Sequence, residues 1–575
     1  MSIGLRGLVR YLWKNRRLVI PGLLALIVSD GCQLVAPLVV KSGVDAVSAP
    51  GPDAADVIIR QAWLLLGLTV GTVVARFVWR HFLLSAARRA EMDLRERLLE
   101  RALSLPVTHY SRTRTSEIMA LATNDVSSVR MALAMGMVAG FDATAFAAVA
   151  LVTLFVLNWK LALITAAPFP VLALVMAVAL RMIYHRWDRV QSAFEDLTEK
   201  ARESLSGMRV LRAYVQDEGD LRDFQRFNDA CYHRQMEYVR VDALFHPVIM
   251  LLAGLSMAIL LAFGGAQVAR GEMSLGSFTA FSTYLGMLSW PMIAAGWVLT
   301  LVQRGAASMA RIQEMLDQPS EPTLPEASQA FGGEIVAKNL GFAYPGAEGN
   351  ALSEVSFQVP AGGSLGLVGE VGSGKTTLAF LLSRLYDPPP GTLFLDGIDV
   401  AALNLTQLRR QIAYVPQEAF LFSESISENL RLGDPDADLE RLREVCRLAA
   451  VDDEIGEFPQ GYETMLGERG VTLSGGQKQR LSLARALLKR APVLVLDDTL
   501  SAVDAQAEER VLHGLQDRLE GRTAIVISHR VRSVRDLDQI IVLQKGRVVQ
   551  RGTHAQLLAQ PGYYREMYEL QELEA

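Results

Sequence analysis

Six long apolar stretches in the first half of the chain constrain its fold more than any other feature. A helix needs about 20 mostly apolar residues to cross a bilayer. The stretches that meet this length are Leu18–Val40, Ala62–Leu83, Met131–Leu157, Leu161–Ile183, Ala243–Val268 and Leu275–Val302. Buried helices of a large soluble protein are the alternative, but such helices usually carry more polar residues. We therefore expect an α-helical six-span transmembrane domain.

Basic residues indicate which ends of the spans face the cytoplasm. Arg and Lys crowd the N-terminal segment and residues 85–130 and 184–242, whereas the connections near Asn158 and Arg270 are short and nearly neutral. Cytoplasmic loops carry the excess of Lys and Arg, so both termini are expected inside. No small-residue cleavage site follows the first apolar stretch, which predicts a retained span. A multi-pass protein of a bacterial-type inner (cytoplasmic) membrane is expected.

The two long basic connections carry apolar residues at helical spacing, as at Leu94, Leu98 and Leu103. This pattern predicts that the spanning helices continue into the cytoplasm. Short breaks at Pro106–Ser111 and Tyr214–Gly219 interrupt them. We expect the tips formed there to rest on the soluble part of the chain.

Two acidic residues, Asp30 and Asp142, fall inside predicted spans. A carboxylate in hydrocarbon is costly, so each is expected to face the bundle interior, water or a partner. A cavity or gate residue and a satisfied interhelical hydrogen bond are both compatible with the sequence.

The character of the sequence changes after a Pro/Glu/Ser-rich linker. We expect a transmembrane domain over 1–317, a linker over 318–332 and an α/β domain over 333–575, where short β-rich runs alternate with helices. The net charge of −5 gives no support for a nucleic-acid partner. Three widely spaced cysteines show no metal-ligand pattern.

A glycine-rich loop in this domain lies between a predicted strand, Ser364–Val368, and a predicted helix, Thr377–Leu385. This is the context that a P-loop requires, because backbone amides and a helix N-terminus then surround phosphate oxygens. Lys375 is expected to reach the β- and γ-phosphates of ATP, and the Thr376 hydroxyl to ligate Mg²⁺. The predicted phosphate-binding residues are Gly369, Glu370, Val371, Gly372, Ser373, Gly374, Lys375, Thr376 and Thr377.

A second element is the apolar run Val493–Leu496, which ends in Asp497 and Asp498. Asp497 is placed to hold Mg²⁺, as the second phosphate-site motif of P-loop NTPases does. Asp498 stands where a general base or a water-orienting group is expected.

The segment Leu473-Ser474-Gly475-Gly476-Gln477, followed by a predicted helix over Lys478–Lys489, resembles the signature motif of the ABC ATPase family. In that family this motif contacts the γ-phosphate of a nucleotide bound to the other nucleotide-binding domain. The resemblance therefore implies a dimer in which two ATP molecules are sandwiched head to tail. Ser474, Gly475, Gly476 and Gln477 are the residues that it assigns to nucleotide contact.

Further family motifs follow in the expected order. Tyr344 resembles the aromatic residue that stacks on adenine, and Gln417 resembles the glutamine that senses Mg²⁺ and couples to the membrane domain. Asp504, in Ser501-Ala502-Val503-Asp504, resembles the loop that crosses the dimer interface. His529 resembles the switch histidine that contacts the γ-phosphate and the attacking water.

The membrane half resembles the exporter branch of this superfamily, with the type IV fold. Residues 113–129 and 203–224 resemble its first and second intracellular loops, and Thr464–Gly470 resembles an exporter-specific segment that touches them. Met465 departs from the family, which commonly has Glu there, and this puts one such contact in doubt. The resemblance implies ATP-driven efflux of a hydrophobic or amphipathic molecule, lipid or peptide across the bilayer by alternating access.

The family commonly has Glu where this chain has Asp498. The Asp side chain is one methylene shorter, so its carboxylate lies about 1.5 Å short of the expected position. Misplacement on this scale can cost on the order of a hundredfold in rate. The chain thus resembles the degenerate-site subunit of a heterodimeric exporter, whose partner would carry the catalytic Glu and an altered signature motif.

Other readings remain open at the level of sequence. They are a homodimeric exporter with slower hydrolysis, an ATP-gated channel or regulator, and a soluble ABC-type ATPase whose apolar stretches are not spans. No large regulatory insertion occurs between Val302 and Ala575, which disfavours a regulator. Importers of the family generally keep the two halves on separate chains. The sequence does not identify the transported molecule.

Overall fold

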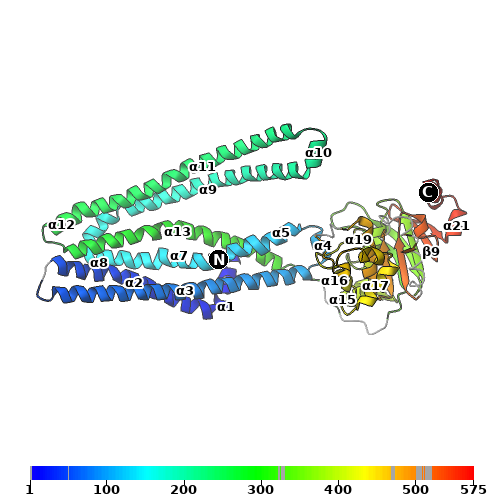
Figure 1. The fold of residues 1–575 in the computed structure, drawn as a ribbon, viewed down its shortest axis with the longest axis horizontal. Helices are drawn as coiled ribbons and strands as arrows, with labels where there is room; N and C mark the ends of the chain where they lie inside the picture. Colours follow the sequence, from blue (N-terminus) through cyan, green and yellow to red (C-terminus); the bar gives the residue numbers. More distant parts are fainter. Residues whose placement is uncertain are drawn as a thin grey trace. The chain divides into compact units, whose positions relative to one another are not determined.

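A computed structural model describes residues 3–48, 51–321, 324, 331–467, 473–499, 508, 510–511 and 521–574. By contacts the chain divides into two compact units, which are described separately here. Unit 1 comprises Met1–Leu105 and Thr113–Pro319, and unit 2 comprises Pro106–Arg112 and Ser320–Ala575. The described part of unit 1 consists of long helices, whereas unit 2 combines two sheets with shorter helices (Figure 1).

Unit 1 begins with a short helix and continues with very long ones. Its first helices are α1 (Ile3–Lys14), α2 (Arg16–Ser48) and α3 (Ala54–Ser104), and its last are α9 (Pro168–Ser206), α10 (Met208–Ala213), α11 (Asp217–Ile259), η4 (Leu260–Gly264), α12 (Gly265–Ala269) and α13 (Leu275–Leu316). Between them one helical stretch contains α5 (Thr115–Ala120), η1 (Leu121–Asp125), α6 (Val126–Met131), η2 (Ala132–Gly136), α7 (Met137–Phe141), η3 (Asp142–Phe146) and α8 (Ala147–Ala166), where η1 to η4 are π-helical turns.

Five helical stretches of the described residues are long and apolar enough to span a membrane. They are Arg16–Ser48, Ala54–Ser104, Thr115–Ala166, Met250–Ala269 and Leu275–Leu316, and they match five of the six expected spans. The remaining one, Leu161–Ile183, runs from the end of α8 into α9, where several side chains are not described, so it stays a prediction. Asn158 has a non-helical backbone (φ −162°, ψ 98°), which separates the third span from the fourth at the expected connection.

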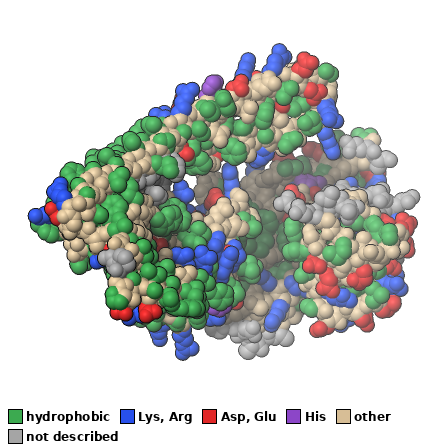
Figure 2. All heavy atoms as spheres, turned by 60° about the vertical axis from the view of Figure 1, so that its left-hand side comes forward, with side chains coloured by type: hydrophobic (Ala, Val, Ile, Leu, Met, Phe, Trp, Pro, Cys, Tyr) green, Lys and Arg blue, Asp and Glu red, His purple; other side chains and the backbone are tan. Residues whose placement is uncertain are grey.

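Apolar side chains cover much of the helical face of unit 1 that Figure 2 shows. The first basic connection of unit 1 contains ion pairs around one buried carboxylate. Glu91 is 5% exposed, and its carboxylate contacts Arg88 and Arg95 at 2.9 Å and Arg130 at 3.3 Å. Guanidinium groups from two helical segments therefore surround one buried carboxylate, and the contact with Arg130 joins α3 to α6.

The second basic connection forms a helical hairpin. Helices α9 and α11 lie side by side, and α10 closes their end (Figure 1). The expected break over Tyr214–Gly219 is shorter in the structure, because α11 already begins at Asp217. The first expected break contains α4 (Val107–Tyr110), and the contacts group it with unit 2.

Unit 2 contains a six-stranded and a four-stranded sheet. The six-stranded sheet has the order β10-β9-β3-β8-β7-β6, and the four-stranded sheet has the order β2-β1-β4-β5. The strands are β1 (Ile335–Phe342), β2 (Leu352–Val359), β3 (Ser364–Gly369), β4 (Leu393–Leu395), β5 (Ile398–Asp399), β6 (Ile412–Val415), β7 (Val493–Asp497), β8 (Thr523–Ile527), β9 (Gln539–Gln544) and β10 (Arg547–Gly552). The described helices are α14 (Lys375–Leu382), α15 (Leu405–Gln411), α16 (Ile426–Arg431), α17 (Leu439–Leu448), α18 (Asp452–Gly456), α19 (Gly475–Leu488), α21 (His554–Leu558) and α22 (Tyr563–Glu574), with 3₁₀ turns η5 (Val400–Ala402), η6 (Gly461–Glu463) and η8 (Val531–Ser533).

Strands β3, β6, β7, β8 and β9 run parallel, and β10 pairs antiparallel with β9. Strands β7 and β8 are buried along their whole length, as expected for a parallel sheet covered on both faces. Because the carboxyl ends of parallel strands meet at one edge, the residues that follow β3, β6, β7 and β8 are brought together there.

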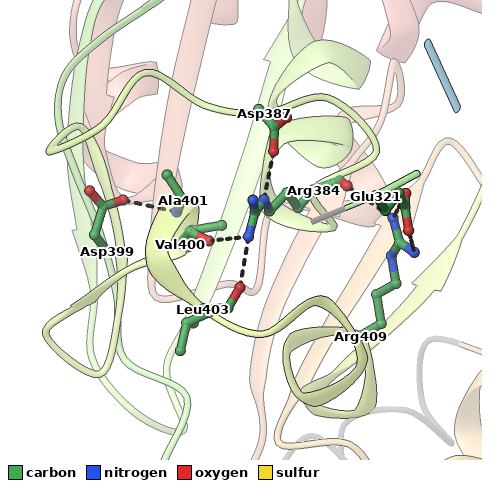
Figure 3. A network of polar contacts seen from close by, with 8 residues as sticks. All are labelled: Glu321, Arg384, Asp387, Asp399, Val400, Ala401, Leu403 and Arg409. Carbon is green, nitrogen blue, oxygen red and sulfur yellow. Dashed lines mark hydrogen bonds and ion pairs between the residues drawn. The ribbon is translucent and has the colours of Figure 1, made fainter. Parts of the chain in front are cut away.

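A network of polar contacts ties the segment before β1 to the rest of unit 2 (Figure 3). Arg409 on α15 makes a bidentate contact with Glu321, at 2.9 and 2.8 Å. The guanidinium of Arg384 is buried and donates to Asp387 (2.6 Å) and to the carbonyl oxygens of Leu403 (2.7 Å) and Val400 (3.3 Å). These charge-assisted bonds fix the loop after α14 against the turn before α15.

Candidate nucleotide site

A cavity of about 300 Å³ opens at the carboxyl ends of the parallel strands in unit 2. Four segments far apart in the sequence meet there, namely those that follow β3, β6, β7 and β8. The structure thereby brings together most of the residues that the motifs singled out. The lining residues are Tyr344, Ala351, Val371, Gly372, Ser373, Gly374, Lys375, Thr376, Thr377, Gln417, Asp497, Asp498, Ile527 and His529.

The loop between β3 and α14 has a backbone that requires glycine. Gly374 precedes α14 with φ +99°, and a Cβ atom there would lie 2.6 Å from the carbonyl oxygen of Ala351. Gly369 has φ +153°, and its Cβ would lie 2.1 Å from the carbonyl oxygen of Leu543. Glycine at these two positions therefore lets the loop turn tightly at the end of the sheet, where no Cβ atom blocks access to its backbone amides. Helix α14 begins at Lys375, two residues before the expected start.

Lys375 lines the cavity, and its ammonium group is bound inside the loop. Nζ donates to the carbonyl oxygens of Gly369 and Glu370, both at 2.8 Å. Burial lowers the pKa of Lys375 below its ordinary value, while the nearby carboxyls of Asp498 and Asp497 act in the opposite direction. A phosphate group entering the cavity would supply a charged acceptor in place of these neutral carbonyls.

Asp497, at the end of β7, is held by two hydroxyl groups. The Thr376 hydroxyl donates to Oδ1 across 3.2 Å, and the Tyr414 hydroxyl donates to Oδ2 across 3.3 Å. Burial raises the pKa of Asp497, and these two hydrogen bonds lower it. A carboxylate and a threonine hydroxyl at this distance are the oxygen ligands that Mg²⁺ prefers, so the donor set fits this ion.

Asp498 adopts a left-handed backbone conformation with φ +48°, which Asp tolerates better than most residues. Its amide donates to the carbonyl oxygen of Ile527 at 2.9 Å, which joins the end of β7 to β8. Its Oδ2 accepts a hydrogen bond from Gln417 Nε2 at 3.4 Å. Gln417, two residues after β6, thus contacts Asp498, the residue that follows β7.

His529 follows β8, and its carbonyl oxygen accepts a hydrogen bond from Gln571 on α22 at 2.7 Å. Burial lowers the pKa of the imidazole below its ordinary value of 6.5, and the nearby Lys375 lowers it further. A lower pKa favours the neutral ring, in which one nitrogen can accept a hydrogen bond.

Tyr344 lines the same cavity, and its hydroxyl contacts a residue of the glycine-rich loop segment, Thr377. The hydroxyl groups of Tyr344 and Thr377 are hydrogen-bonded at 3.0 Å, and the Tyr344 ring packs edge-on against Phe342 and Tyr386. Burial raises its pKa. Stacking on an adenine ring stays a prediction for this residue.

Ser474 and Gln477 form a capping box at the start of α19. The Gln477 amide donates to Ser474 Oγ (3.2 Å), and the Ser474 amide donates to Gln477 Oε1 (2.8 Å). The helix therefore begins at Gly475 rather than at Lys478 as expected, because the capping box draws both glycines into the first turn. These residues do not line the cavity described above.

Two predicted segments are not covered in full. Asp504 and the rest of Ser501–Asp504 lie outside the described residues, as do residues 468–470 of the exporter-specific segment. Met465, where the family commonly has Glu, is 58% exposed and pairs with Ser425 in an isolated β-bridge.

The sequence did not single out Tyr414, although it contacts Asp497. Its position immediately before Val415-Pro416-Gln417 at the end of a strand was the available signal. The register of β6 on β7, with Tyr414 opposite Val495, places its ring near the cavity.

A membrane-embedded helical unit joined to a P-loop ATPase unit of this topology defines the class of ATP-dependent membrane transporters. Two family models match the chain, the ABC transporter transmembrane region over residues 19–292 and the ABC transporter family over residues 352–501. The chain belongs to the ABC transporter family.

Relatives match the chain over nearly its whole length. The probable multidrug resistance ABC transporter ATP-binding/permease protein YheI of Bacillus subtilis is 36% identical over 564 residues, 98% of this chain and 96% of that protein. The multidrug resistance-like ATP-binding protein MdlA of Escherichia coli is 37% identical over 559 residues, 96% of this chain and 93% of that one. The ATP-dependent lipid A-core flippase of Pseudomonas fluorescens is 34% identical over 521 residues, with 88% and 83% covered.

A solved structure of a bacterial Atm1-family ABC exporter with ATP bound superposes with a TM-score of 0.80, at 26% identity, over 97% of this chain and 98% of that one. The fold is therefore that of an ABC exporter, as expected. The chain is an integral membrane exporter of the multidrug and lipid-flippase type, and its ATPase domain couples ATP hydrolysis to transport.

Proposed function

We propose that this chain is one half of a heterodimeric exporter and that its own P-loop site hydrolyses ATP slowly. The observation that carries this proposal is Asp498. Its side chain is one methylene shorter than the Glu expected there, and its carboxylate contacts Gln417 at 3.4 Å. A carboxylate that ends about 1.5 Å short of the attacking water is a poor orienting group.

The cavity residues divide into groups by the part of MgATP that each would hold. Tyr344 would stack on adenine, and residues 369–377 would surround the phosphates with amides and the Lys375 ammonium. Thr376, Gln417 and Asp497 would hold Mg²⁺, which supplies charge neutralisation on the β- and γ-phosphates. His529 would contact the γ-phosphate. Asp498 would orient the attacking water less well than a Glu would, and ATP hydrolysis would be slower as a result.

The other half of the proposal concerns the partner. The Ser474–Gln477 segment is intact and preorganised by its capping box, so it is suited to cover a nucleotide held by a second half-transporter. That partner would carry the catalytic Glu and an altered signature motif facing Lys375. Asp504 would lie at the interface between the two ATPase domains.

We propose that the membrane domain comprises residues 1–317, that the linker comprises residues 318–332 and that the nucleotide-binding domain comprises residues 333–575. Both termini are proposed to lie in the cytoplasm and the spans in the inner membrane.

ATP binding at both sites would close the two ATPase domains, and the cytoplasmic helix extensions would follow them. The bundle would then turn from inward- to outward-facing. ATP drives this change because its affinity differs between open and closed states.

The transported molecule is proposed to be hydrophobic or amphipathic. Relatives named for multidrug resistance and for lipid A-core flipping support this class. Exposed apolar side chains on the spanning helices, such as Val152, Val156 and Leu163, are suited to a bilayer environment.

Inside-out membrane vesicles test the exporter proposal. Vesicles that contain the transporter are expected to accumulate an amphipathic dye against its gradient with ATP but not with a non-hydrolysable analogue. Lys375→Ala vesicles are the matched control and are expected to accumulate none. Dissipation of a dye gradient without accumulation would identify a channel and contradict the proposal. Purification of tagged chain from its native membranes tests the partner: a different half-transporter is expected, and a second copy of this chain would contradict the heterodimer.

A further inference from the structure

One side chain from a distant part of unit 2 binds two backbone groups of the loop that follows β8. Gln571 Nε2 donates to the carbonyl oxygen of His529 at 2.7 Å, and the Val531 amide donates to Gln571 Oε1 at 2.8 Å. Gln571 lies on α22, 42 positions after His529, so the contact is a product of the fold. Both hydrogen bonds have ordinary lengths, and together they hold the backbone on either side of Arg530.

The side-chain amide of Gln571 has one orientation that satisfies both backbone groups. The His529 carbonyl oxygen requires a donor and the Val531 amide requires an acceptor, and a Gln side chain supplies one of each. An ionised Glu has nearly the same shape but no donor. The contact therefore depends on the chemistry of the Gln side chain and not on its size alone.

Helix α22 is itself anchored, which fixes the position of Gln571. Tyr564 and Met567 are buried, and they belong to the same apolar cluster as Val531 and Val534. Residues 564, 567 and 571 are spaced as i, i+3 and i+7, so they lie on one face of the helix. This face packs against the segment that follows β8 and carries the Gln571 amide to it.

The loop that Gln571 holds forms one wall of the candidate nucleotide site. His529 lines the cavity, as do Lys375 and Asp498. Gln571 is not one of the residues that line the cavity. Any effect of Gln571 on a nucleotide would therefore pass through the loop, because a shift of the His529 backbone moves the imidazole with it.

We propose that Gln571 is a positioning residue of the nucleotide site, which fixes the backbone of His529 so that the imidazole meets the γ-phosphate of ATP. This inference rests on the proposed contact between His529 and the γ-phosphate, and it adds the group that holds His529 in place. A group that acts on a reacting phosphate loses much of its effect when it is displaced by about 1 Å. Because ADP lacks the γ-phosphate, loss of Gln571 is expected to weaken the binding of ATP and to spare that of ADP.

Competition binding separates a positioning role from a purely structural one. The non-hydrolysable ATP analogue AMP-PNP and ADP, each with Mg²⁺, displace a fluorescent ATP analogue from the full-length chain in nanodiscs, and the ratio of their Kd values is the readout. His529→Ala is expected to raise the Kd for AMP-PNP about tenfold, the effect of one lost contact with a charged group. Gln571→Ala is expected to raise it at least about threefold and to leave the Kd for ADP within about twofold.

Two further variants show whether Gln571 acts through His529. Gln571→Glu keeps the size of the side chain and an acceptor for the Val531 amide but removes the donor to the His529 carbonyl oxygen. It is expected to bind both nucleotides as Gln571→Ala does. The double variant Gln571→Ala/His529→Ala is expected to match His529→Ala, because two residues that act through one contact do not contribute additively.

Gln556→Ala is the matched control. Gln556 also binds the backbone through its side-chain amide, since the Thr553 amide donates to its Oε1 at 3.0 Å in the capping box of α21. The control removes the same kind of side chain and a similar backbone contact at residues that do not line the cavity. Its Kd values for AMP-PNP and ADP are expected to equal those of the unmodified chain.

The possible outcomes distinguish this inference from the proposed function. If His529→Ala changes the ratio of Kd values but either Gln571 variant leaves it unchanged, or weakens both nucleotides equally, the inference is overturned and the role of His529 stands. An unchanged ratio in His529→Ala would refute that role and the inference with it. The ratio is measured without hydrolysis, so it does not depend on whether Asp498 makes the site slow.

Discussion

The side-chain amide of Gln417 donates to the carboxylate of Asp498 across 3.4 Å. These residues follow neighbouring parallel strands, β6 and β7, and both line the cavity. The contact holds the Asp498 carboxylate, which is buried, in the wall of the cavity. In the proposed function, the position of this one side chain sets how fast the site hydrolyses ATP.

Two glycines of the phosphate loop are expected to respond differently to alanine. Gly374→Ala is expected to abolish ATP binding and lower the melting temperature, because its Cβ would lie 2.6 Å from the Ala351 carbonyl oxygen at a φ of +99°. Gly372 has φ +79°, and no atom lies within 4 Å of its added Cβ. Gly372→Ala is therefore expected to cost only the backbone strain, about 1–2 kcal/mol. Titration with a fluorescent ATP analogue compares them, and equal losses would contradict the clash.

His529 is expected to make the ATPase domain less stable in acid. Burial and the nearby Lys375 hold the pKa of His529 below 6.5, so the unfolded chain binds more protons than the folded one between the two pKa values. Stability therefore rises with pH through this window and is lost as the pH falls below about 6.5. Thermal unfolding from pH 7.5 to 5 is expected to show a smaller loss in His529→Gln. An identical loss in both proteins would refute this contribution.

Arg384 is expected to be a stability residue of the ATPase domain (Figure 3). Arg384→Ala removes a buried guanidinium and leaves the carbonyl oxygens of Val400 and Leu403 without this donor, at a cost of about 3 kcal/mol. Asp387→Ala removes the exposed end of the same ion pair and is expected to cost less than about 1 kcal/mol. Differential scanning fluorimetry measures both, and a larger effect at Asp387 would reverse the assignment.

The membrane domain contains a close approach that only glycine permits. The Gly276 amide donates to Asp45 Oδ1 at 2.8 Å, and a Cβ at Gly276 would lie 2.1 Å from the Lys41 carbonyl oxygen. Gly276→Ala is expected to separate the start of α13 from the end of α2, with a destabilisation of about 1–3 kcal/mol. Gly286→Ala on the same helix meets no atom within 4 Å and is the control. Matching melting temperatures in detergent would contradict the contact.

The local motifs predicted most of the residues that line the cavity, because each motif depends on a few consecutive residues. The strand, the glycine loop and the helix around Lys375 can be recognised from consecutive residues, and so can the strand that ends in Asp497. Five spans were predicted for the same reason, because each is one continuous apolar stretch. The start of α19 was predicted three residues late, because the reciprocal bonds of Ser474 and Gln477 outweigh the poor helix propensity of two glycines.

Contacts that depend on strand register or helix packing were not predictable. Tyr414 reaches Asp497 because β6 pairs with β7 in one register, and a sequence pattern does not fix that register. Asp30 and Asp142 were each recognised as costly in a membrane, but a sequence pattern does not show that the fold brings the two carboxyl groups within electrostatic range. The hydrogen bond between Tyr344 and Thr377 likewise joins separate elements.

ATP turnover by the purified chain alone, before and after Asp498→Glu, tests the central claim most directly. Lys375→Ala provides the background rate, and binding of the fluorescent analogue shows that each protein holds nucleotide. The unmodified chain is expected to bind ATP with turnover close to background, and Asp498→Glu is expected to raise the rate on the order of a hundredfold by restoring the carboxylate position. Robust turnover by the unmodified chain, with no gain from Asp498→Glu, would contradict the account.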